Sequence, residues 1–198
     1  MRLIAIIVTA LVLSACGPTT SHPATSSSAI SLDCTKTSNN AQQLVCGDPH
    51  LMDLEHRLQT AYQQALARPG ADQAGLTAAQ DSWRTVRDGC AQNADVRTCV
   101  VEAYQTRLVQ LAIADPATVT PAVITYHCPL GSGPLTAQFY NQFDPATAVL
   151  NWNGDQEILF VQPSGSGARY GRQGVEYWEH QGEVRLDFNG NKFVCTTR

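Results

Sequence analysis

Ala148-Val149-Leu150-Asn151-Trp152-Asn153-Gly154 is the stretch that decides the fold of the C-terminal half, together with the run Ile158-Leu159-Phe160-Val161 that follows it. Both runs are rich in β-branched, aromatic and aliphatic residues, as strands are. The dipeptide Asn153-Gly154 between them is a strong signal for a two-residue β-hairpin turn, because both residue types tolerate the left-handed backbone that such a turn needs. We therefore expect two antiparallel strands that are joined at this turn.

Further short segments with strand-like composition occur on both sides of this hairpin. They are residues 123–128, 135–140, 175–178, 184–188 and 193–195, and Asn189-Gly190 marks another hairpin turn. Many short strands at close spacing are typical of an antiparallel barrel or sandwich. We predict an antiparallel β-barrel over residues 122–198. Cys128 and Cys195 lie near its two ends, so a disulfide between them would close nearly the whole domain.

The N-terminal half has a helical period instead. Over residues 32–112, apolar residues recur at steps of three and four, as in amphipathic helices. One such stripe consists of Leu51, Leu54, Leu58, Tyr62 and Leu66, and it is interrupted at Pro69-Gly70. A shorter helix is expected over residues 40–46. The fold class predicted for the chain is α+β in two domains: a disulfide-braced small helical bundle over 32–112, a linker over 113–121, and the antiparallel β-barrel.

The N-terminus has the features of an export signal. Residues 1–15 carry Arg2 and then an apolar run over 3–13 that is too short to span a bilayer. The sequence Leu13-Ser14-Ala15-Cys16 looks like a bacterial lipobox, in which Cys16 becomes the lipid-modified first residue after cleavage. An ordinary signal peptide cleaved near Ala15 is the alternative. Residues 16–31 then read as a Pro/Ser/Thr-rich tether, so we expect an exported protein that is lipid-anchored to the cell membrane or envelope surface.

Six cysteines besides Cys16 are left, and an even number in an exported chain is typical of disulfides. Four of them fall in the helical half, at positions 34, 46, 90 and 99. An intact helix between Cys34 and Cys46 would hold the two too far apart to bridge. This argument favours pairs that link Cys34 and Cys46 to Cys90 and Cys99, in an order that stays open. No closely spaced pair such as Cys-x-x-Cys occurs, so we expect no metal.

The composition and motifs favour no catalytic chemistry. A formal net charge of −4 argues against general nucleic-acid binding and would suit a basic protein partner. The chain contains no Gly-x-Ser-x-Gly, no phosphate-binding Gly-rich loop with Lys, and no His-Glu-x-x-His. His50, Asp53, Glu55 and His56 are interpreted as a solvated helix face. We therefore expect neither an enzyme nor a cofactor.

The segment Pro163-Ser164-Gly165-Ser166-Gly167-Ala168-Arg169-Tyr170 lies between a strand-like run and a second aromatic segment. Gly and Ser permit tight turns with exposed hydroxyl groups, so we expect a hairpin loop carried by a rigid sheet. Such a loop is able to act as a probe that enters the cleft of another protein.

Two sets of motifs resemble known families. In the C-terminal half they are Tyr126-x-Cys128, Ser166-Gly167-x-x-Tyr170 and Tyr177-Trp178, which resemble the membrane-bound inhibitors of C-type lysozyme, the MliC/PliC family. In the N-terminal half they are Cys34, Cys46, Gln80-x-x-Trp83-x-x-x-Arg87-x-x-Cys90, Cys99 and Tyr104-x-x-Arg107-Leu108, which resemble the LprI N-terminal domain. In this order, the chain resembles the mycobacterial LprI family of lysozyme-inhibitor lipoproteins over its whole length.

The resemblance implies a mechanism. In the inhibitor family, a Ser and a Lys carried by loops of a disulfide-linked barrel meet the two catalytic carboxyl groups in the lysozyme cleft. Carried over by position, Ser166 takes the role of the Ser. Gly167 allows close backbone approach, and Tyr170 braces the base of the loop.

The position of the family lysine is occupied by His180 in this sequence. Two interpretations stay open. In the first, His180 is a solvated turn residue, and Arg169 or Arg172 supplies the positive charge. In the second, protonated His180 faces a lysozyme carboxylate and strengthens binding.

The leading hypothesis is therefore a surface lipoprotein that inhibits C-type lysozyme and so protects peptidoglycan, with lysozyme and, through Cys16, the membrane as its partners. The alternative is a cell-envelope binding module or adhesin without inhibitory activity, and a third hypothesis is an envelope hydrolase. The helical half shows no site of its own. It would serve as a second lysozyme-binding surface, a spacer, or a module for another envelope partner.

Overall fold

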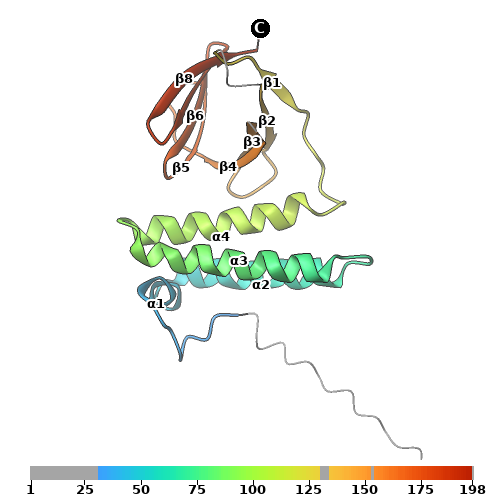
Figure 1. Cartoon of the computed structure of the whole chain (residues 1–198), viewed down its shortest axis with the longest axis vertical. Coiled ribbons are helices and arrows are strands. Elements are labelled where there is room, and N and C mark those ends of the chain that lie inside the picture. Colours follow the sequence, from blue (N-terminus) through green and yellow to red (C-terminus); the bar gives the residue numbers. More distant parts are fainter. Residues whose placement is uncertain (1–30, 130–133, 153, 198) are drawn as a thin grey trace, which may run out of the picture.

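The computed structural model describes residues 31–129, 134–152 and 154–197. In this part of the chain, helices come first and an antiparallel barrel follows, so the predicted fold class is confirmed. The helices lie side by side beneath the barrel (Figure 1). The predicted signal peptide, the lipidation site Cys16 and nearly all of the tether lie outside the described residues, and so does Asn153 of the predicted turn.

Each helix begins where a polar side chain caps it. The helices are α1 (Asn40–Gly47), α2 (Pro49–Ala67), α3 (Gln73–Gly89) and α4 (Val96–Ile113), with a 3-10 turn η2 (Cys90–Gln92) after α3. The side chains of Asn39, Asp48, Asp72 and Asp95 each accept a hydrogen bond from a backbone N–H in the first turn of the helix that follows. Because the first N–H groups of a helix have no partner within it, these caps fix the starts of the helices.

The predicted apolar stripe of α2 forms the centre of the helical core. Leu51, Leu54, Leu58 and Tyr62 are buried there. The core also holds an edge-to-face pair of Trp83 and Tyr104, with ring centroids 5.1 Å apart.

One residue of α2 departs from the expected solvated face. His50, Asp53 and His56 are exposed, but Glu55 is only 8% exposed. Its carboxylate accepts hydrogen bonds from the Tyr104 hydroxyl at 2.7 Å and from the backbone N–H of Leu32 at 2.9 Å. The interpretation of Glu55 as solvated is therefore wrong, because these two donors and the buried guanidinium of Arg87, 3.9 Å away, satisfy its carboxylate.

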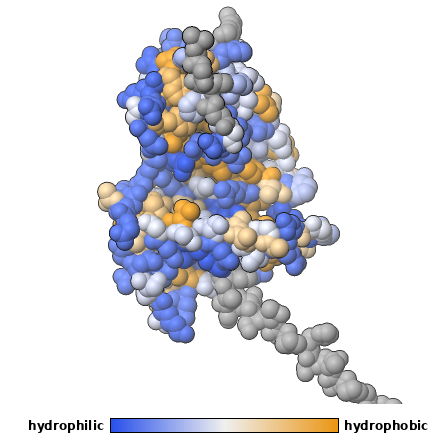
Figure 2. Space-filling view, viewed as in Figure 1, coloured by the Kyte–Doolittle hydropathy of each residue, from blue (hydrophilic) through white to orange (hydrophobic). Residues whose placement is uncertain are grey.

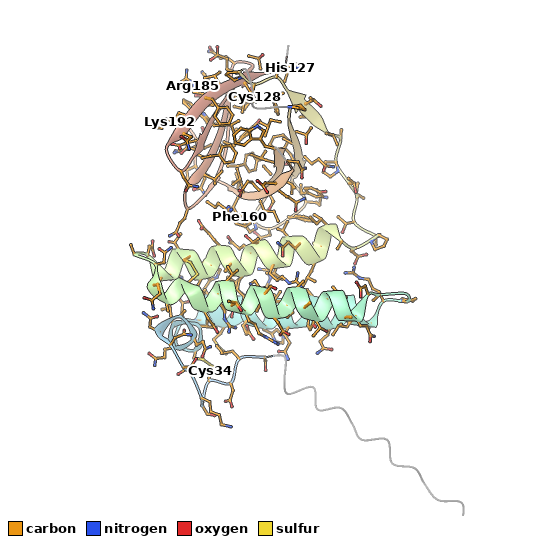
Figure 3. The ribbon with its side chains drawn as sticks, viewed as in Figure 1. Cys34, His127, Cys128, Phe160, Arg185 and Lys192 are labelled. Carbon is orange, nitrogen blue, oxygen red and sulfur yellow. A yellow bond between two sulfur atoms is a disulfide. The ribbon has the colours of Figure 1, made fainter. Side chains whose placement is uncertain are left out.

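The disulfides of the helical half contradict the predicted cross-pairing. Cys34 is bonded to Cys46, and Cys90 is bonded to Cys99, with Cα atoms 5.7 and 5.6 Å apart. Helix α1 begins at Asn40, as expected, and the distance argument failed because it extended this helix back to Cys34. The residues between Cys34 and Asn39 form a turn outside the helix, so Cys34 folds back onto the far end of α1. Figure 3 shows Cys34 in this segment ahead of α1.

In the part of the chain that the structure describes, eight strands form one antiparallel sheet in which each strand pairs with the next. They are β1 (Ile124–Tyr126), β2 (Leu135–Tyr140), β3 (Thr147–Trp152), β4 (Asp155–Val161), β5 (Ala168–Arg172), β6 (Val175–His180), β7 (Glu183–Phe188) and β8 (Asn191–Thr196). Paired backbone hydrogen bonds between His127 and Thr196 bring the last strand back to the first, so the barrel is nearly closed. The predicted disulfide between Cys128 and Cys195 is confirmed at this seam.

The two Asn-Gly hairpins lie where the sequence predicts them. Trp152 pairs with Asp155, which leaves two residues for the turn, and Gly154 has a φ of 88°. Phe188 pairs with Asn191 in the same way, and the intervening Asn189 and Gly190 have φ values of 52° and 88°. Positive φ at both turn residues is the backbone for which Asn-Gly is selected.

The barrel packs against α4 through the outer face of β2 to β4. Val109 of α4 shares an apolar cluster with Tyr140, Val149, Ile158 and Phe160. In Figure 3, Phe160 lies between the barrel and the helices, and Figure 2 shows apolar residues in orange where these two parts meet. This contact explains why strand residues on the outside of the barrel are buried.

Hydrogen bonds add to this contact. The carboxylate of Glu102 on α4 accepts the backbone N–H of Gln173, with N···O distances of 3.0 and 3.1 Å. At another point of the contact, Arg57 of α2 donates to the carbonyl oxygen of Asp144. Helix α4 ends at Ile113 and β1 begins at Ile124, so the predicted linker starts at the last residue of the helix.

Candidate functional site

The candidate site lies at one end of the barrel. Hairpin connections alternate between the two ends of an up-and-down sheet, so the connections β2–β3, β4–β5 and β6–β7 share this end. The β4–β5 connection is residues 162–167, and we call residues 163–167 the probe loop. Ala168, Arg169 and Tyr170, expected in the loop, belong to β5 instead.

Gly167 brings the probe loop against the neighbouring strand β6. Its φ of 69° lies in the left-handed region. A Cβ atom at this position would lie 1.9 Å from the carbonyl oxygen of Glu179 and 3.3 Å from the Cα of His180. Only glycine permits this approach of the probe loop to β6, and the predicted role of Gly167 toward lysozyme stays a prediction.

The backbone of the probe loop is held by the hydroxyl group of Ser164, within the loop, and by the indole of Trp178 on β6. The carbonyl oxygen of Ser166 accepts a hydrogen bond from Nε1 of Trp178 at 3.1 Å and from Oγ of Ser164 at 2.6 Å. At the base of the loop, the N–H of Gln162 donates to the carbonyl oxygen of Arg169 at 2.8 Å. Ser166 itself is exposed, and none of the hydrogen bonds found among the described residues uses its Oγ. The hydroxyl of Ser166 is therefore free to meet a partner.

Tyr170 lies inside the barrel below the loop. It is 7% exposed, and its ring centroid is 5.4 Å from that of Phe139 and 6.2 Å from that of Tyr177. Burial raises the pKa of its phenol. Tyr170 thus anchors the strand that carries the loop and is not itself a surface group.

The two arginines considered as sources of positive charge both have carboxylate partners. Arg169 forms an ion pair with Glu176 on the adjacent strand. Arg172 pairs with Glu157, whose Oε2 lies 3.1 Å from Nε of Arg172. Either arginine would have to give up or share its partner in order to neutralise a lysozyme carboxylate.

His180 stands at the end of β6 beside the loop. Its ring stacks on Trp178, with ring centroids 5.7 Å apart and an interplanar angle of 24°. The guanidinium of Arg185, directly opposite Trp178 on β7, lies 5.4 Å from the indole centroid. Trp178 therefore contacts the probe loop, the imidazole and a cation at the same time. Figure 3 shows Arg185 on the outer face of the barrel.

The sequence motifs include Trp178 but do not single out Arg185. The alternation Trp-x-His along one strand does put Trp178 and His180 on the same face. The partnership with Arg185 requires the β6–β7 register, which the sequence alone does not specify.

Within the described ranges, no group of three or more His, Cys, Asp or Glu side chains is arranged to hold a metal ion. The helices in those ranges also lack the combination of length and apolar character that a membrane span needs.

Comparison with known proteins gives two family matches. Residues 34–111 match the family described as lysozyme inhibitor LprI, and residues 126–194 match the family described as membrane-bound lysozyme-inhibitor of c-type lysozyme. Proteins named Lipoprotein LprI from Mycobacterium bovis and from Mycobacterium tuberculosis are 68% identical to this chain over 198 residues, which is the full length of both chains in each case. No solved structure matches the chain.

Proposed function

Because the chain belongs to the LprI family of lysozyme inhibitors, we propose that it blocks C-type lysozyme by inserting the probe loop into the active-site cleft of the enzyme. Both matched families are inhibitor families, so the chain is not an enzyme. Inhibition would protect peptidoglycan from hydrolysis.

The observation that carries this mechanism is the exposed hydroxyl of Ser166 on a loop whose backbone is already held in place. A C-type lysozyme has two carboxyl groups that flank the scissile bond in a cleft. Filling the cleft removes water from these groups, which is costly unless a donor replaces it. The hydroxyl of Ser166 supplies such a donor, and the braced loop reduces the entropy that is lost on binding.

We assign the second contact to His180, in the position of the family lysine. The stacking on Trp178 keeps the imidazole beside the probe loop. The carboxylate partners of Arg169 and Arg172 favour His180 over these two arginines. A protonated imidazole would form a charge-assisted hydrogen bond with a lysozyme carboxylate.

The cellular context is part of the proposal. The relatives are named lipoproteins, and one matched family is membrane-bound. We propose that Cys16 carries the lipid and that residues 16–31 tether the folded part to the cell membrane or envelope surface. A mass spectrum of the mature N-terminus tests this, and an unmodified Cys16 would refute it.

A titration of the protein into lysozyme-treated cells tests the function. An inhibitor slows lysis at ratios near one to one. The alternative, a non-inhibitory envelope binding module or adhesin, binds without slowing lysis, and a hydrolase degrades cell-wall material without added lysozyme. Unchanged lysis at several-fold excess of the protein would exclude the proposed function.

A further inference from the structure

A cavity lies between helices α3 and α4, where the β5–β6 connection reaches the helices. Its volume is about 540 Å³, within the range of pockets that hold small ligands. The apolar and uncharged polar side chains of its wall are chiefly Trp83, Val86, Ala103, Ser82, Thr106 and Gln110. Gln173, which also lines it, belongs to the β5–β6 connection. Because connections alternate between the two ends of the barrel, this cavity lies at the end opposite to the probe loop.

Arg107 contributes a buried guanidinium to the wall of this cavity. The residue is 5% exposed, and no ion pair found among the described residues includes it. By contrast, the equally buried Arg87 lies against the carboxylates of Glu55 and Asp88. Burial of a cation without a carboxylate partner is costly, and it lowers the pKa of Arg107. The cavity is therefore complementary to an anion.

The chain itself supplies no anion for Arg107. All of its Asp and Glu residues lie in the described ranges, and none of them forms an ion pair with this guanidinium. The last strand, β8, ends at the probe-loop end of the barrel, so the C-terminal carboxylate is remote as well. An anion that pairs with Arg107 has to come from another molecule.

The terminal nitrogens of Arg107 have donors left for such a molecule. A guanidinium carries five N–H donors. Nε of Arg107 donates to Oε1 of the buried Gln80 at 2.9 Å, which holds the side chain in place. The two terminal nitrogens reach only Oε1 of Gln110 at 3.4 Å and the carbonyl oxygen of Leu76 at 3.5 Å, and both distances are long for a hydrogen bond. A planar carboxylate is the anion that accepts two parallel N–H groups from such a fork.

The other charges of the wall narrow the class of anion. Glu102 also lines the cavity, so a ligand with several negative charges is repelled there. Arg172, the remaining cation of the wall, is paired with Glu157. The cavity therefore favours a ligand with one carboxylate and an otherwise uncharged body.

The shape and lining of the cavity favour a peptide as that body. Ala79 and Cys90 line it on α3, and they are about 16 Å apart along the helix at about 1.5 Å per residue. An extended chain rises about 3.3 Å per residue, so roughly four or five peptide residues fit this length. The hydroxyl and carboxamide groups of Ser82, Thr106 and Gln110 are able to meet peptide groups, and Val86 offers apolar contact.

We propose that this cavity binds the C-terminal segment of a short peptide, with the terminal carboxylate of that peptide on Arg107. The helical half then has a binding site of its own, separate from the loop that is assigned to lysozyme. The inference does not depend on the proposed function, because the two sites lie at opposite ends of the barrel.

The first test uses N-acetylated tetra-alanine with a free terminal carboxylate, and the same peptide as a terminal carboxamide. Each is titrated into the full chain, and NMR follows the indole N–H of Trp83 and the backbone amides of α3 and α4. At about 10 mM peptide, a site with a dissociation constant of about 1 mM is nearly saturated. We expect saturable shifts with the carboxylate and at least about tenfold weaker binding of the carboxamide, since hydrogen bonds to charged groups are strong. No saturable shift, or equal binding of the two peptides, would overturn the proposal.

The second test adds a negative charge beside Arg107 without changing the core. Val86 is 62% exposed and lines the cavity, whereas Met52 is 42% exposed on α2 and does not line it. Val86→Glu should weaken binding of the carboxylate peptide by about tenfold or more, because like charges are brought together. Met52→Glu should bind within about twofold of the wild type, since exposed charges contribute little. Equal binding by the two variants would contradict the assigned position of the carboxylate.

Two further outcomes bear on the proposal. Sodium acetate that binds as tightly as the peptide would reduce the cavity to a simple anion site and overturn the peptide assignment. Val86→Glu should inhibit lysozyme as the wild type does, because the probe loop lies at the other end of the barrel. Loss of inhibition in this variant would assign the cavity to the lysozyme contact instead. A chain that binds the peptide but does not inhibit lysozyme would refute the proposed function and leave this inference standing.

Discussion

The indole Nε1 of Trp178 donates a hydrogen bond to the carbonyl oxygen of Ser166 at 3.1 Å, so the residue that presents the hydroxyl is held by a side chain on the neighbouring strand. Trp178→Phe keeps an aromatic ring at this position and removes this donor. A hydrogen bond has a net worth of about 0.5–1.5 kcal/mol, so we expect lysozyme inhibition to weaken by roughly two- to tenfold and the thermal unfolding temperature to fall by no more than a few degrees. Inhibition constants measured beside thermal melts check this, and an unchanged inhibition constant would show that the indole does not position the loop.

Gly167 and Gly165 form a matched pair for testing the shape of the loop. A Cβ at Gly167 meets the carbonyl oxygen of Glu179, whereas a Cβ at Gly165 meets no atom within 4 Å. Gly167→Ala should displace the loop, reduce inhibition by about tenfold or more, and cost on the order of 1–3 kcal/mol of stability. Gly165→Ala should inhibit nearly as well as the wild type. Equal inhibition by the two variants would contradict the close approach of Gly167 to β6.

His180 makes the inhibition dependent on pH if it provides the cation. Only the protonated imidazole is a cation, and a lower pH favours that form. Binding to the carboxylates should therefore be tighter at about pH 5.5 than at about pH 7.5. In His180→Ala this difference should be lost. Because lysozyme titrates as well, the inhibition constant of His180→Ala is divided by that of the wild type at each pH. A ratio that is independent of pH refutes the role of His180 as the cation.

Glu102 links pH to stability at the contact between the helices and the barrel. Burial raises the pKa of its carboxyl group, and the hydrogen bond from Gln173 opposes this only in part. The folded state therefore binds the carboxyl proton of Glu102 more tightly than the unfolded state does. The ionised carboxylate destabilises the fold at neutral pH, and this effect is lost as the pH falls through the raised pKa. Glu102→Gln should be equally or more stable than the wild type near pH 7, and should lose that advantage near pH 4. Denaturant unfolding at the two pH values gives the free energies of unfolding of both proteins. A Glu102→Gln variant that is less stable than the wild type at pH 7 but not at pH 4 would show that the carboxylate stabilises the fold.

Peptide mapping under non-reducing conditions should find the links Cys34–Cys46, Cys90–Cys99 and Cys128–Cys195. The first bond closes the segment that leads into α1, and the second closes the connection between α3 and α4. Loss of such a bond costs on the order of 3 kcal/mol in the chain-entropy model. Peptides that join Cys34 or Cys46 to Cys90 or Cys99 would support the cross-pairing that the helical period suggested.

The features that the sequence predicts well are local ones. The positive φ values of Asn189 and Gly190 follow from the chemistry of the turn itself, and the burial of Leu54 and Leu58 follows from the period of one helix. The exposed position of Ser166 follows in the same way from a Gly- and Ser-rich loop between two strands.

The features that it does not predict depend on contacts between distant residues. Glu55 has the sequence surroundings of a solvated residue, but its partner Tyr104 is 49 positions away. The pairing of Cys34 with Cys46 depends on the path of a turn that no periodicity describes. The contact of Tyr126 with Tyr177 inside the barrel exists only once β1 and β6 belong to one sheet, so no single segment encodes it.

The most direct test of the central claim is a lysis titration with Ser166→Asp and, as a control, Ser31→Asp in the full chain. Both changes add one negative charge at an exposed serine, but only the first sets that charge against the two lysozyme carboxyl groups. Like charges brought together at an interface cost several kcal/mol. The Ser166→Asp variant should therefore protect cells only at about a hundredfold or more of the wild-type concentration. Ser31→Asp should protect as the wild type does. Full protection by Ser166→Asp at the wild-type ratio would show that the probe loop does not enter the cleft.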